Sequence, residues 1–385
     1  MIQQLPPLAG LRVIESSILG PAAITTSFVD LGAEVIKVES PSGDYIREMT
    51  WPIIEGVSLM HYHLNRGKKS ITLDLKNEAG KELYRELVRD ADAVIEAMRP
   101  GVLAKLGLGF EDLRKVNPAI VFCTVSGYGM TGPYKDMPSH GIAYDTWSGA
   151  VTPAYDEEGF CYIPEHVSIG INAAPLFGGL AVLAGVLRAR ATGSGCMMEL
   201  GQSDAAAYFD WYRCESHLAY ARPQDVVTGN KADGYERRPV ATAGMKEGVR
   251  YQIYASSDGH VLFMASEQAF WKNFCEGVGR GDLFEKWPGS RYADHARGNR
   301  ELQRELREIF RSRSSAQWME FGTRVNTPIA PVNTPQNIVD DPQFKARFRI
   351  LPHEKHGADM LGFPVQFVGE NLPAPAIAPT AGQHT

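Results

Sequence analysis

Residues 11–39 read LRVIESSILGPAAITTSFVDLGAEVIKVE, and this stretch decides the fold class. The apolar runs at 11–15 and 33–38 predict two strands, and residues 21–31 between them predict a helix. Such a strand–helix–strand unit makes its strands parallel, because the helix carries the chain back to the same end of the sheet. We therefore expect an α/β protein.

The same alternation continues along the chain. Apolar periodicity predicts helices at 77–90, 110–116 and 172–189, and strands at 93–96, 119–126 and 196–200. Strands that alternate with helices in this way favour a parallel, doubly wound sheet with helices on both faces.

The pattern changes after residue 221. Residues 222–248 are polar and rich in turn formers, which is typical of a linker or loop. Beyond them, predicted strands at 251–255 and 260–265 flank Ser256-Ser257-Asp258-Gly259, a hairpin signal. Helices predicted at 268–278, 299–311 and 315–324 complete a smaller α+β unit.

Composition narrows the class of protein. The 385 residues, 44% of them hydrophobic, favour two domains. The formal net charge of −6 argues against a nucleic-acid partner, which would call for a basic excess. Five scattered cysteines without a CxxC pair indicate a reducing compartment. Residues 1–11 lack a signal-peptide pattern, and no run approaches the roughly 20 apolar residues of a membrane span, so we expect a cytoplasmic protein without membrane association.

Two motifs are poor matches to the sites they suggest. Residues 127–132 fit GxGxxG after a strand, but Pro133 and Pro138 predict a loop where a dinucleotide site needs a helix. His61 and His63 have no acidic or cysteine partner at metal-ligand spacing, so we expect no metal site.

A basic cluster surrounds two strand ends. Residues 65–69, NRGKK, precede a strand at 70–75 that Lys76 closes, and Arg99 and Lys105 flank another strand-to-helix turn. Phosphate groups pair with such cations and with exposed backbone N–H groups. A solvated rim explains the same pattern, and the residues by themselves leave both interpretations open.

Seven ordered blocks resemble the family III CoA-transferases (CaiB/BaiF type), a superfamily that includes formyl-CoA transferase-like enzymes and 2-methylacyl-CoA racemases. The blocks span nearly the whole chain: DLGAEVIKVE (30–39), NRGK (65–68) with SITLDLK (70–76), ADAVIE (91–96) with RPG (99–101) and GLG (107–109), SGYGMTGP (126–133), TGSG (192–195), PIAPVN (328–333) and DPQ (341–343).

The resemblance implies a Rossmann-like large domain, an inserted small α+β domain and an interlocked dimer. On this chain, residues 1–222 would form the N-terminal part of the large domain and 223–250 a linker. Residues 251–325 would form the small domain, and 326–385 would return to the large domain. Coenzyme A, as the substrate thioester, would be bound by Ile18, Leu19, Lys37, Arg66, Lys68, Leu73, Lys76, Ala97, Met98, Arg99 and Lys105.

The nucleophile of the family is missing from its expected place. Family transferases attack the thioester with an aspartate at a helix N-terminus, forming a mixed anhydride and then an enzyme thioester. Counted back from the TGSG block, the transferase spacing reaches Ile171 and the racemase spacing reaches Gly170. No aspartate occurs between Gly159 and Gln202, and Glu165 is the nearest acid in sequence.

Two other residues resemble the catalytic pair of the racemases. Residues 139–144, SHGIAY, match their GHDIxY segment with Gly141 in place of the aspartate, so His140 would be the base. Glu267 stands where the racemases place a glutamate that pairs with it. A carboxylate-held histidine is a good general base near neutral pH. Equally, His140 can be a loop residue and Glu267 an ordinary acid at a helix start.

The resemblance implies transfer of CoA between carboxylic acids, with an acyl-CoA and a carboxylic acid as partners. Two alternatives remain open. The chain can be the non-catalytic subunit of a heteromeric CoA-transferase, paired with an aspartate-bearing homologue. It can also perform racemase- or isomerase-like α-proton chemistry with His140 and Glu267. We expect a homodimer or such a heteromer.

Overall fold

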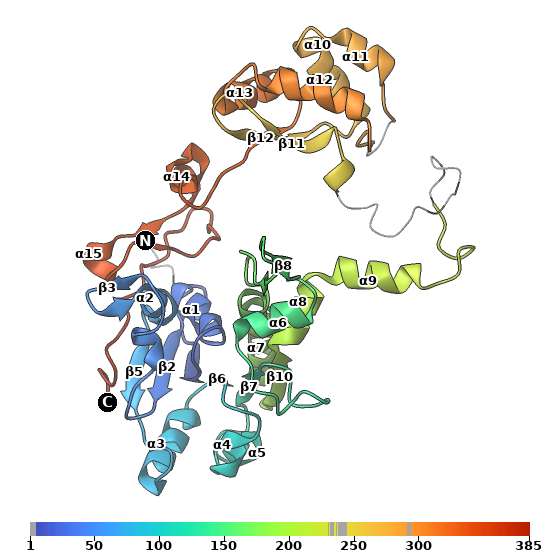
Figure 1. Cartoon of the computed structure of the whole chain (residues 1–385). Coiled ribbons are helices and arrows are strands. Elements are labelled where there is room, and N and C mark those ends of the chain that lie inside the picture. The colour runs from blue at the N-terminus through green and yellow to red at the C-terminus, as the bar shows by residue number, and fades with distance from the viewer. Residues whose placement is uncertain (1–4, 230, 232–234, 236, 238–244, 291–293) are drawn as a thin grey trace. The chain divides into compact units, whose positions relative to one another are not determined.

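The computed structural model describes residues 5–229, 231, 235, 237, 245–290 and 294–385. It contains two compact units (Figure 1). The first unit comprises Met1–Glu215 and Phe348–Thr385, and the second comprises Ser216–Arg347. The chain thus leaves the first unit before the predicted boundary at 222 and re-enters it after the predicted boundary at 325.

A six-stranded sheet forms the centre of the first unit, with the order β10-β7-β6-β1-β2-β5. Every neighbouring pair is parallel, which confirms the predicted parallel α/β sheet. The strands are β1 (Arg12–Ser16), β2 (Glu34–Glu39), β5 (Lys69–Thr72), β6 (Ala93–Glu96), β7 (Val121–Ser126) and β10 (Cys196–Gly201).

Helices cover both faces of this sheet. Val13 packs with Phe28 of α1 (Ala22–Asp30) and Val186 of α7 (Gly170–Thr192) on one face. Its neighbour Ile14 points to the opposite face, because successive side chains of a strand alternate. There it packs with Tyr84 of α3 (Glu78–Arg89) and Leu113 of α5 (Phe110–Val116). The remaining helices of the unit are α2 (Leu59–Asn65), α4 (Val102–Lys105), α6 (Gly141–Trp147), α8 (Gln202–Phe209), α9 (Trp211–Tyr220) and α15 (His353–His356), of which α9 continues into the second unit.

Helix α7 corrects one expectation from the sequence. Its 23 residues are long and apolar enough to cross a membrane by length and composition, whereas no such run was expected. Half of its most apolar window is buried within the protein, where Val182, Val186 and Ala189 belong to the core beneath the sheet. Burial in the core thus accounts for part of the apolar sequence, whereas Leu176, Leu180 and Leu187 of the same helix are exposed.

Short elements complete the first unit. Two-stranded antiparallel sheets are formed by β3 (Ile53–Ile54) with β4 (Val57–Ser58), β8 (Ala154–Tyr155) with β9 (Cys161–Tyr162), and β14 (Ile350–Leu351) with β15 (Met360–Leu361). The C-terminal segment lies along β5, where the backbone N–H of His384 donates to the carbonyl of Ser70. The carbonyl of Pro379 also lies 3.1 Å from Nε2 of His61 on α2.

The second unit is a small α+β unit. Strands β11 (Tyr251–Ala255), β12 (His260–Met264) and β13 (Ile329–Pro331) form an antiparallel sheet, and the predicted hairpin joins the first two. Phe263, Trp271, Phe274, Phe310 and Trp318 fill its core with ring contacts. The helices are α10 (Gln268–Gly277), α11 (Gly281–Lys286), α12 (Arg300–Phe310), α13 (Ser315–Val325) and α14 (Pro342–Arg347).

Candidate functional site

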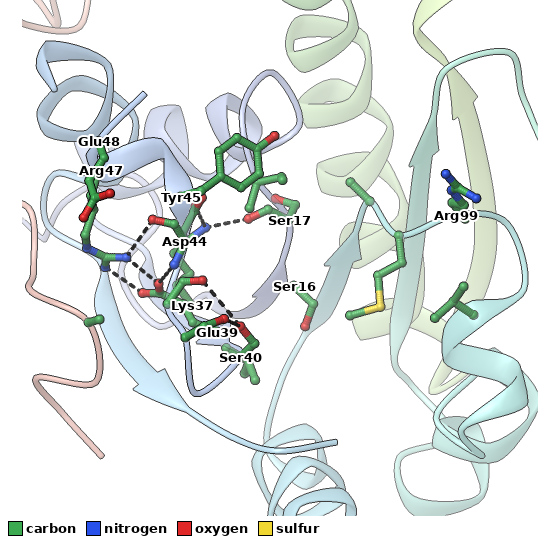
Figure 2. Close-up of a pocket in the computed structure, with 18 residues that line it drawn as sticks. Ser16, Ser17, Lys37, Glu39, Ser40, Asp44, Tyr45, Arg47, Glu48 and Arg99 are labelled. Carbon is green, nitrogen blue, oxygen red and sulfur yellow. Dashed lines mark hydrogen bonds and ion pairs between the residues drawn. The ribbon is translucent and has the colours of Figure 1, made fainter. Parts of the chain in front are cut away.

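A cavity of about 900 Å³ opens at the carboxyl ends of β1, β2 and β6 (Figure 2). The chain runs from β1 outward through β2 to β5 and then returns to place β6 on the other side of β1. Open parallel sheets bind ligands where the strand order reverses in this way, outside the carboxyl ends of the strands. The position of this β1–β6 cavity therefore marks it as the candidate ligand site of the first unit.

Five of the predicted CoA-binding residues line the β1–β6 cavity. They are Ile18, Lys37, Ala97, Met98 and Arg99. Arg99 is exposed and makes no ion pair within the described part of the chain, so its guanidinium is available to an anion. Ile18 and Met98 add an apolar part to the wall, which thus combines a cation with apolar surface.

Lys37 is a fixed charge in this wall. Its side chain is buried, and Nζ lies 3.0 Å from Asp44 and 3.2 Å from Glu15, and donates to the carbonyl of Ser17. Burial alone would lower the pKa of Lys37, but the carboxylates of Glu15 and Asp44 outweigh it and raise the pKa above its usual value. Lys37 therefore stays charged and holds together the loops that follow β1 and β2, as Figure 2 shows.

Arg66 and Lys68 lie outside the lining of the cavity. The guanidinium of Arg66 donates to both oxygens of Asp30, at 2.9 and 2.6 Å. Nζ of Lys68 lies 2.7 Å from Glu15, and burial lowers its pKa to about 8 although the Glu15 carboxylate opposes this. Both charges are thus already neutralised by buried acids of the first unit.

The other predicted CoA-binding residues also lie away from the lining. Leu73 is buried in the core with Tyr84. Lys76 and Lys105 are exposed, the second at the end of α4. Leu19 continues the turn after Ile18 in the left-handed conformation, with φ of 56°.

The start of α7 holds a buried carboxylate that sequence reasoning missed. Asp145, at the end of α6, is fully buried, and its Oδ1 accepts the backbone N–H groups of Ile169 at 3.1 Å and Gly170 at 2.7 Å. Its Oδ2 has no hydrogen-bond partner within the described residues and lies 3.4 Å from Nε2 of His166. Helix N-termini carry free N–H groups and partial positive charge, so Asp145 caps α7 from a distant point of the sequence.

Glu165, the nearest acid in sequence, is exposed, whereas Asp145 contacts the helix start directly. The only sequence signal for Asp145 was an acid within the largely apolar stretch 142–147, IAYDTW. That signal is weak, because helix surfaces commonly carry single acids.

Ile171 occupies the place where the transferase spacing puts the nucleophile. A Cβ atom at Gly20 would lie 3.1 Å from Cβ of Ile171, and a Cβ atom at Gly141 would lie 2.8 Å from its Cγ2. Gly20 follows the turn at Ile18 in the cavity wall, and Gly141 follows His140. The backbone at Gly20 and the backbone at Gly141 thus both lie against the side chain of Ile171 at the start of α7.

The predicted catalytic pair is divided between the two units. His140 is exposed and precedes α6 in the first unit. Glu267 is exposed and precedes α10 in the second unit. Each residue stands at a helix start, and neither bonds to its helix through its side chain.

His61 is used structurally. Its Nδ1 accepts from Nδ2 of Asn65 at 3.0 Å, and its Nε2 lies 3.1 Å from the carbonyl of Pro379. Both contacts fit a neutral ring with its proton on Nε2. Burial, with the nearby charge of Arg47, lowers the pKa of His61 to about 4, which keeps the ring neutral.

Comparison with known proteins places the chain in a family. The model of CoA-transferase family III matches residues 8–385. The probable fatty acyl-CoA transferase Rv3272 of Mycobacterium tuberculosis is 30% identical over 390 residues, covering 98% of this chain and 96% of that protein. The succinyl-CoA–L-malate CoA-transferase beta subunit of Chloroflexus aurantiacus is 28% identical, covering 97% and 87%. The crystal structure of Rv3272 matches with a TM-score of 0.79 at 27% identity, over 99% of this chain and 98% of that one. This chain therefore belongs to CoA-transferase family III.

Proposed function

We propose that the protein takes part in the transfer of CoA from an acyl-CoA thioester to a carboxylic acid and binds CoA in the β1–β6 cavity. The observation that carries this proposal is the coincidence of five predicted CoA-binding residues in one cavity at the strand-order reversal of a family III chain. Arg99 would pair with a phosphate group, and Ile18 and Met98 would contact apolar parts of the cofactor. Lys37, through its contacts with Ser17 and Asp44, would hold the loops after β1 and β2 that form the wall of the cavity.

The start of α7 bears on which chemical step this chain performs. Gly170 and Ile171 replace the carboxylate that the family uses, and neither side chain can attack a thioester. The buried Asp145 already accepts the N–H groups of Ile169 and Gly170, and its full burial keeps it from a substrate in this conformation. We therefore propose that an aspartate-bearing homologous subunit supplies the nucleophile. The name of the Chloroflexus relative, a beta subunit, supports a heteromeric assembly.

A second candidate function is α-proton chemistry. His140 is exposed next to Gly141, which packs against Ile171. An exposed histidine can serve as a general base if a carboxylate such as Glu267 orients it. With no carboxylate at Gly170, only one face of the α-carbon would have a base, which favours one-base reactions such as proton exchange.

To test the proposal, the chain would be purified by itself and also after co-expression with an aspartate-bearing homologue, and both preparations would be assayed. The isolated chain should bind CoA but transfer none from succinyl-CoA to a panel of mono- and dicarboxylic acids. Co-expression with the homologue should give a complex that performs the transfer. Failure to bind CoA at millimolar concentration would overturn the proposal, and efficient transfer by the isolated chain would overturn the need for a second subunit.

A further inference from the structure

A second pocket, of about 440 Å³, lies within the second unit between α12 and β11. These two elements pack together, and both are labelled in Figure 1. Four arginines line it: Arg300, Arg304, Arg307 and Arg311. None of its lining residues is acidic. This arginine pocket shares no residue with the β1–β6 cavity.

The four arginines form one stripe along α12 and its C-cap. Their spacing of four, three and four residues repeats the helical period, so their side chains share a face. Leu302, Leu306 and Phe310 of the same helix are buried in the core of the unit. From Arg300 to Arg311 the stripe runs about 16 Å, at about 1.5 Å for each residue. It is therefore longer than a single carboxylate or phosphate group.

The charge of this stripe is only partly compensated. Glu308 accepts from Arg307 at 2.9 Å and from Arg311 at 3.4 Å. The guanidinium of Arg300 donates to the neutral Gln303 at 2.6 Å. Arg304 has no ion pair or hydrogen bond through its side chain within the described residues. The arginine pocket therefore carries an excess of positive charge, although the whole chain has a net charge of −6. Because like charges three and four residues apart repel one another on a helix, this excess is unfavourable without a bound anion.

The remaining wall is less polar. Ile253 on β11 is 49% exposed and lines the pocket. Because β11 pairs only with β12 among the described strands, the wall also includes an unpaired strand edge. The volume falls within the range of about 300–1,000 Å³ that is usual for small-molecule sites. The pocket can thus hold an organic group against Ile253 and its anionic groups against the arginines.

We propose that the arginine pocket binds a small organic phosphate that carries more than one negative charge, such as a nucleoside diphosphate. A planar guanidinium group donates to two phosphate oxygens at once. Several arginines on one helix face can therefore bind the oxygens of a diphosphate together. The inference does not depend on the proposed CoA chemistry, because a different unit and different residues form the pocket.

Calorimetry on the full chain with ADP and with inorganic pyrophosphate, at 50 and 200 mM NaCl, tests the proposal. The double variant Arg300→Gln/Arg304→Gln removes two cations without breaking any ion pair. It should weaken binding of both probes at least tenfold and reduce the salt dependence. Lys272→Gln, an exposed cation on α10 of the same unit, is the matched control and should bind like the wild type.

Melting temperature separates a binding role from a structural one. Without ligand the double variant should melt at the same temperature as the wild type or slightly higher, because like-charge repulsion is relieved. ADP should raise the melting temperature of the wild type and of Lys272→Gln more than that of the double variant. The proposal is overturned if the wild type shows no saturable binding at millimolar probe, or if the double variant binds as well as the control. Tighter binding of succinate than of pyrophosphate would overturn the phosphate assignment.

Discussion

Oδ1 of Asp145 accepts a hydrogen bond from the backbone N–H of Gly170 at 2.7 Å, so a carboxylate of α6 caps the N-terminus of α7. The two residues are 25 positions apart. A negative charge at this helix end is favourable because of the unpaired N–H groups there. Here the carboxylate is buried and holds the helix, and the position that would face a substrate carries the hydrocarbon side chain of Ile171. The carboxylate at this helix end therefore stabilises the first unit and does not face the solvent.

Removal of this cap should destabilise the first unit. Asp145→Ala leaves the N–H groups of Ile169 and Gly170 without this acceptor, and we expect the free energy of unfolding to fall by about 1–3 kcal/mol. Asp145→Asn keeps an oxygen but loses the charge and should cost less. Urea denaturation followed by circular dichroism measures both. Glu165→Gln, at an exposed acid close in sequence, should leave stability unchanged; an equal loss in this control would contradict the capping role.

CoA affinity should depend on Arg99 and on salt. Arg99→Gln removes an exposed cation from the β1–β6 cavity, and loss of a charge-assisted hydrogen bond of about 1.5–3 kcal/mol weakens binding roughly tenfold or more. Affinity should also fall as ionic strength rises, because exposed charges are screened. Calorimetry with CoA and dephospho-CoA measures these effects. Arg114→Gln, at an exposed arginine of α5, is the control, and equal weakening in both variants would contradict this site.

The isolated wild type should form no covalent adduct with CoA, whereas Ile171→Asp should gain one. The variant places a carboxylate at the helix start between the turns at Gly20 and Gly141, where a nucleophile would meet the thioester. Incubation with acyl-CoA, borohydride or hydroxylamine trapping and intact-protein mass spectrometry would detect the adduct. Ile171→Asn has similar size but no nucleophile and should stay unmodified. An adduct on the wild type would show that another carboxylate performs the attack.

The parallel sheet was predictable because its signals are local. Runs such as 119–126 are short and apolar, and segments with helical periodicity separate them. Each run overlaps a strand of the observed sheet. Five of the residues that the family resemblance implies for CoA binding line one cavity at the carboxyl ends of β1, β2 and β6. Such features depend on neighbours in sequence and on the geometry common to parallel sheets.

Features that depend on distant partners were not predictable. The sequence predicts this helix from residue 172, yet α7 begins at Gly170, and Asp145 caps it. Arg66 and Lys68 are expected from the resemblance to bind CoA, but Asp30 and Glu15, far away in sequence, pair with them in the interior. Periodicity and motif spacing carry no information about such pairs.

If His140 is a working base, the protein should exchange the α-proton of a 2-methylacyl-CoA with deuterated water. A single base can remove and return a proton on one face, so exchange should proceed with retention of configuration. His140→Ala should abolish exchange while CoA binding persists, and Glu267→Gln should slow it by roughly 10²-fold or more. Mass spectrometry of the thioester follows the reaction. Clear CoA binding without exchange over a broad substrate panel would favour the non-catalytic subunit.

Stability should fall in mild acid because of His61. The pKa of this ring is lowered to about 4 by burial and by Arg47, whereas an unfolded histidine titrates near 6.5. Between these pH values the unfolded chain binds a proton that the folded chain does not, so the free energy of unfolding decreases as the pH falls from 6.5 to 4. For His61 alone the loss amounts to about 3 kcal/mol, at about 1.4 kcal/mol for each pH unit.

Denaturation at a series of pH values would reveal this contribution. His61→Gln can still donate to the carbonyl of Pro379 through its amide but cannot bind a proton in this range. The variant should start less stable at neutral pH, because the contact of Nδ1 with Asn65 is lost, and should then lose less stability than the wild type down to pH 4. Parallel curves for the two proteins would mean that His61 is equally easy to protonate in the folded and unfolded states, contrary to its burial against the C-terminal segment.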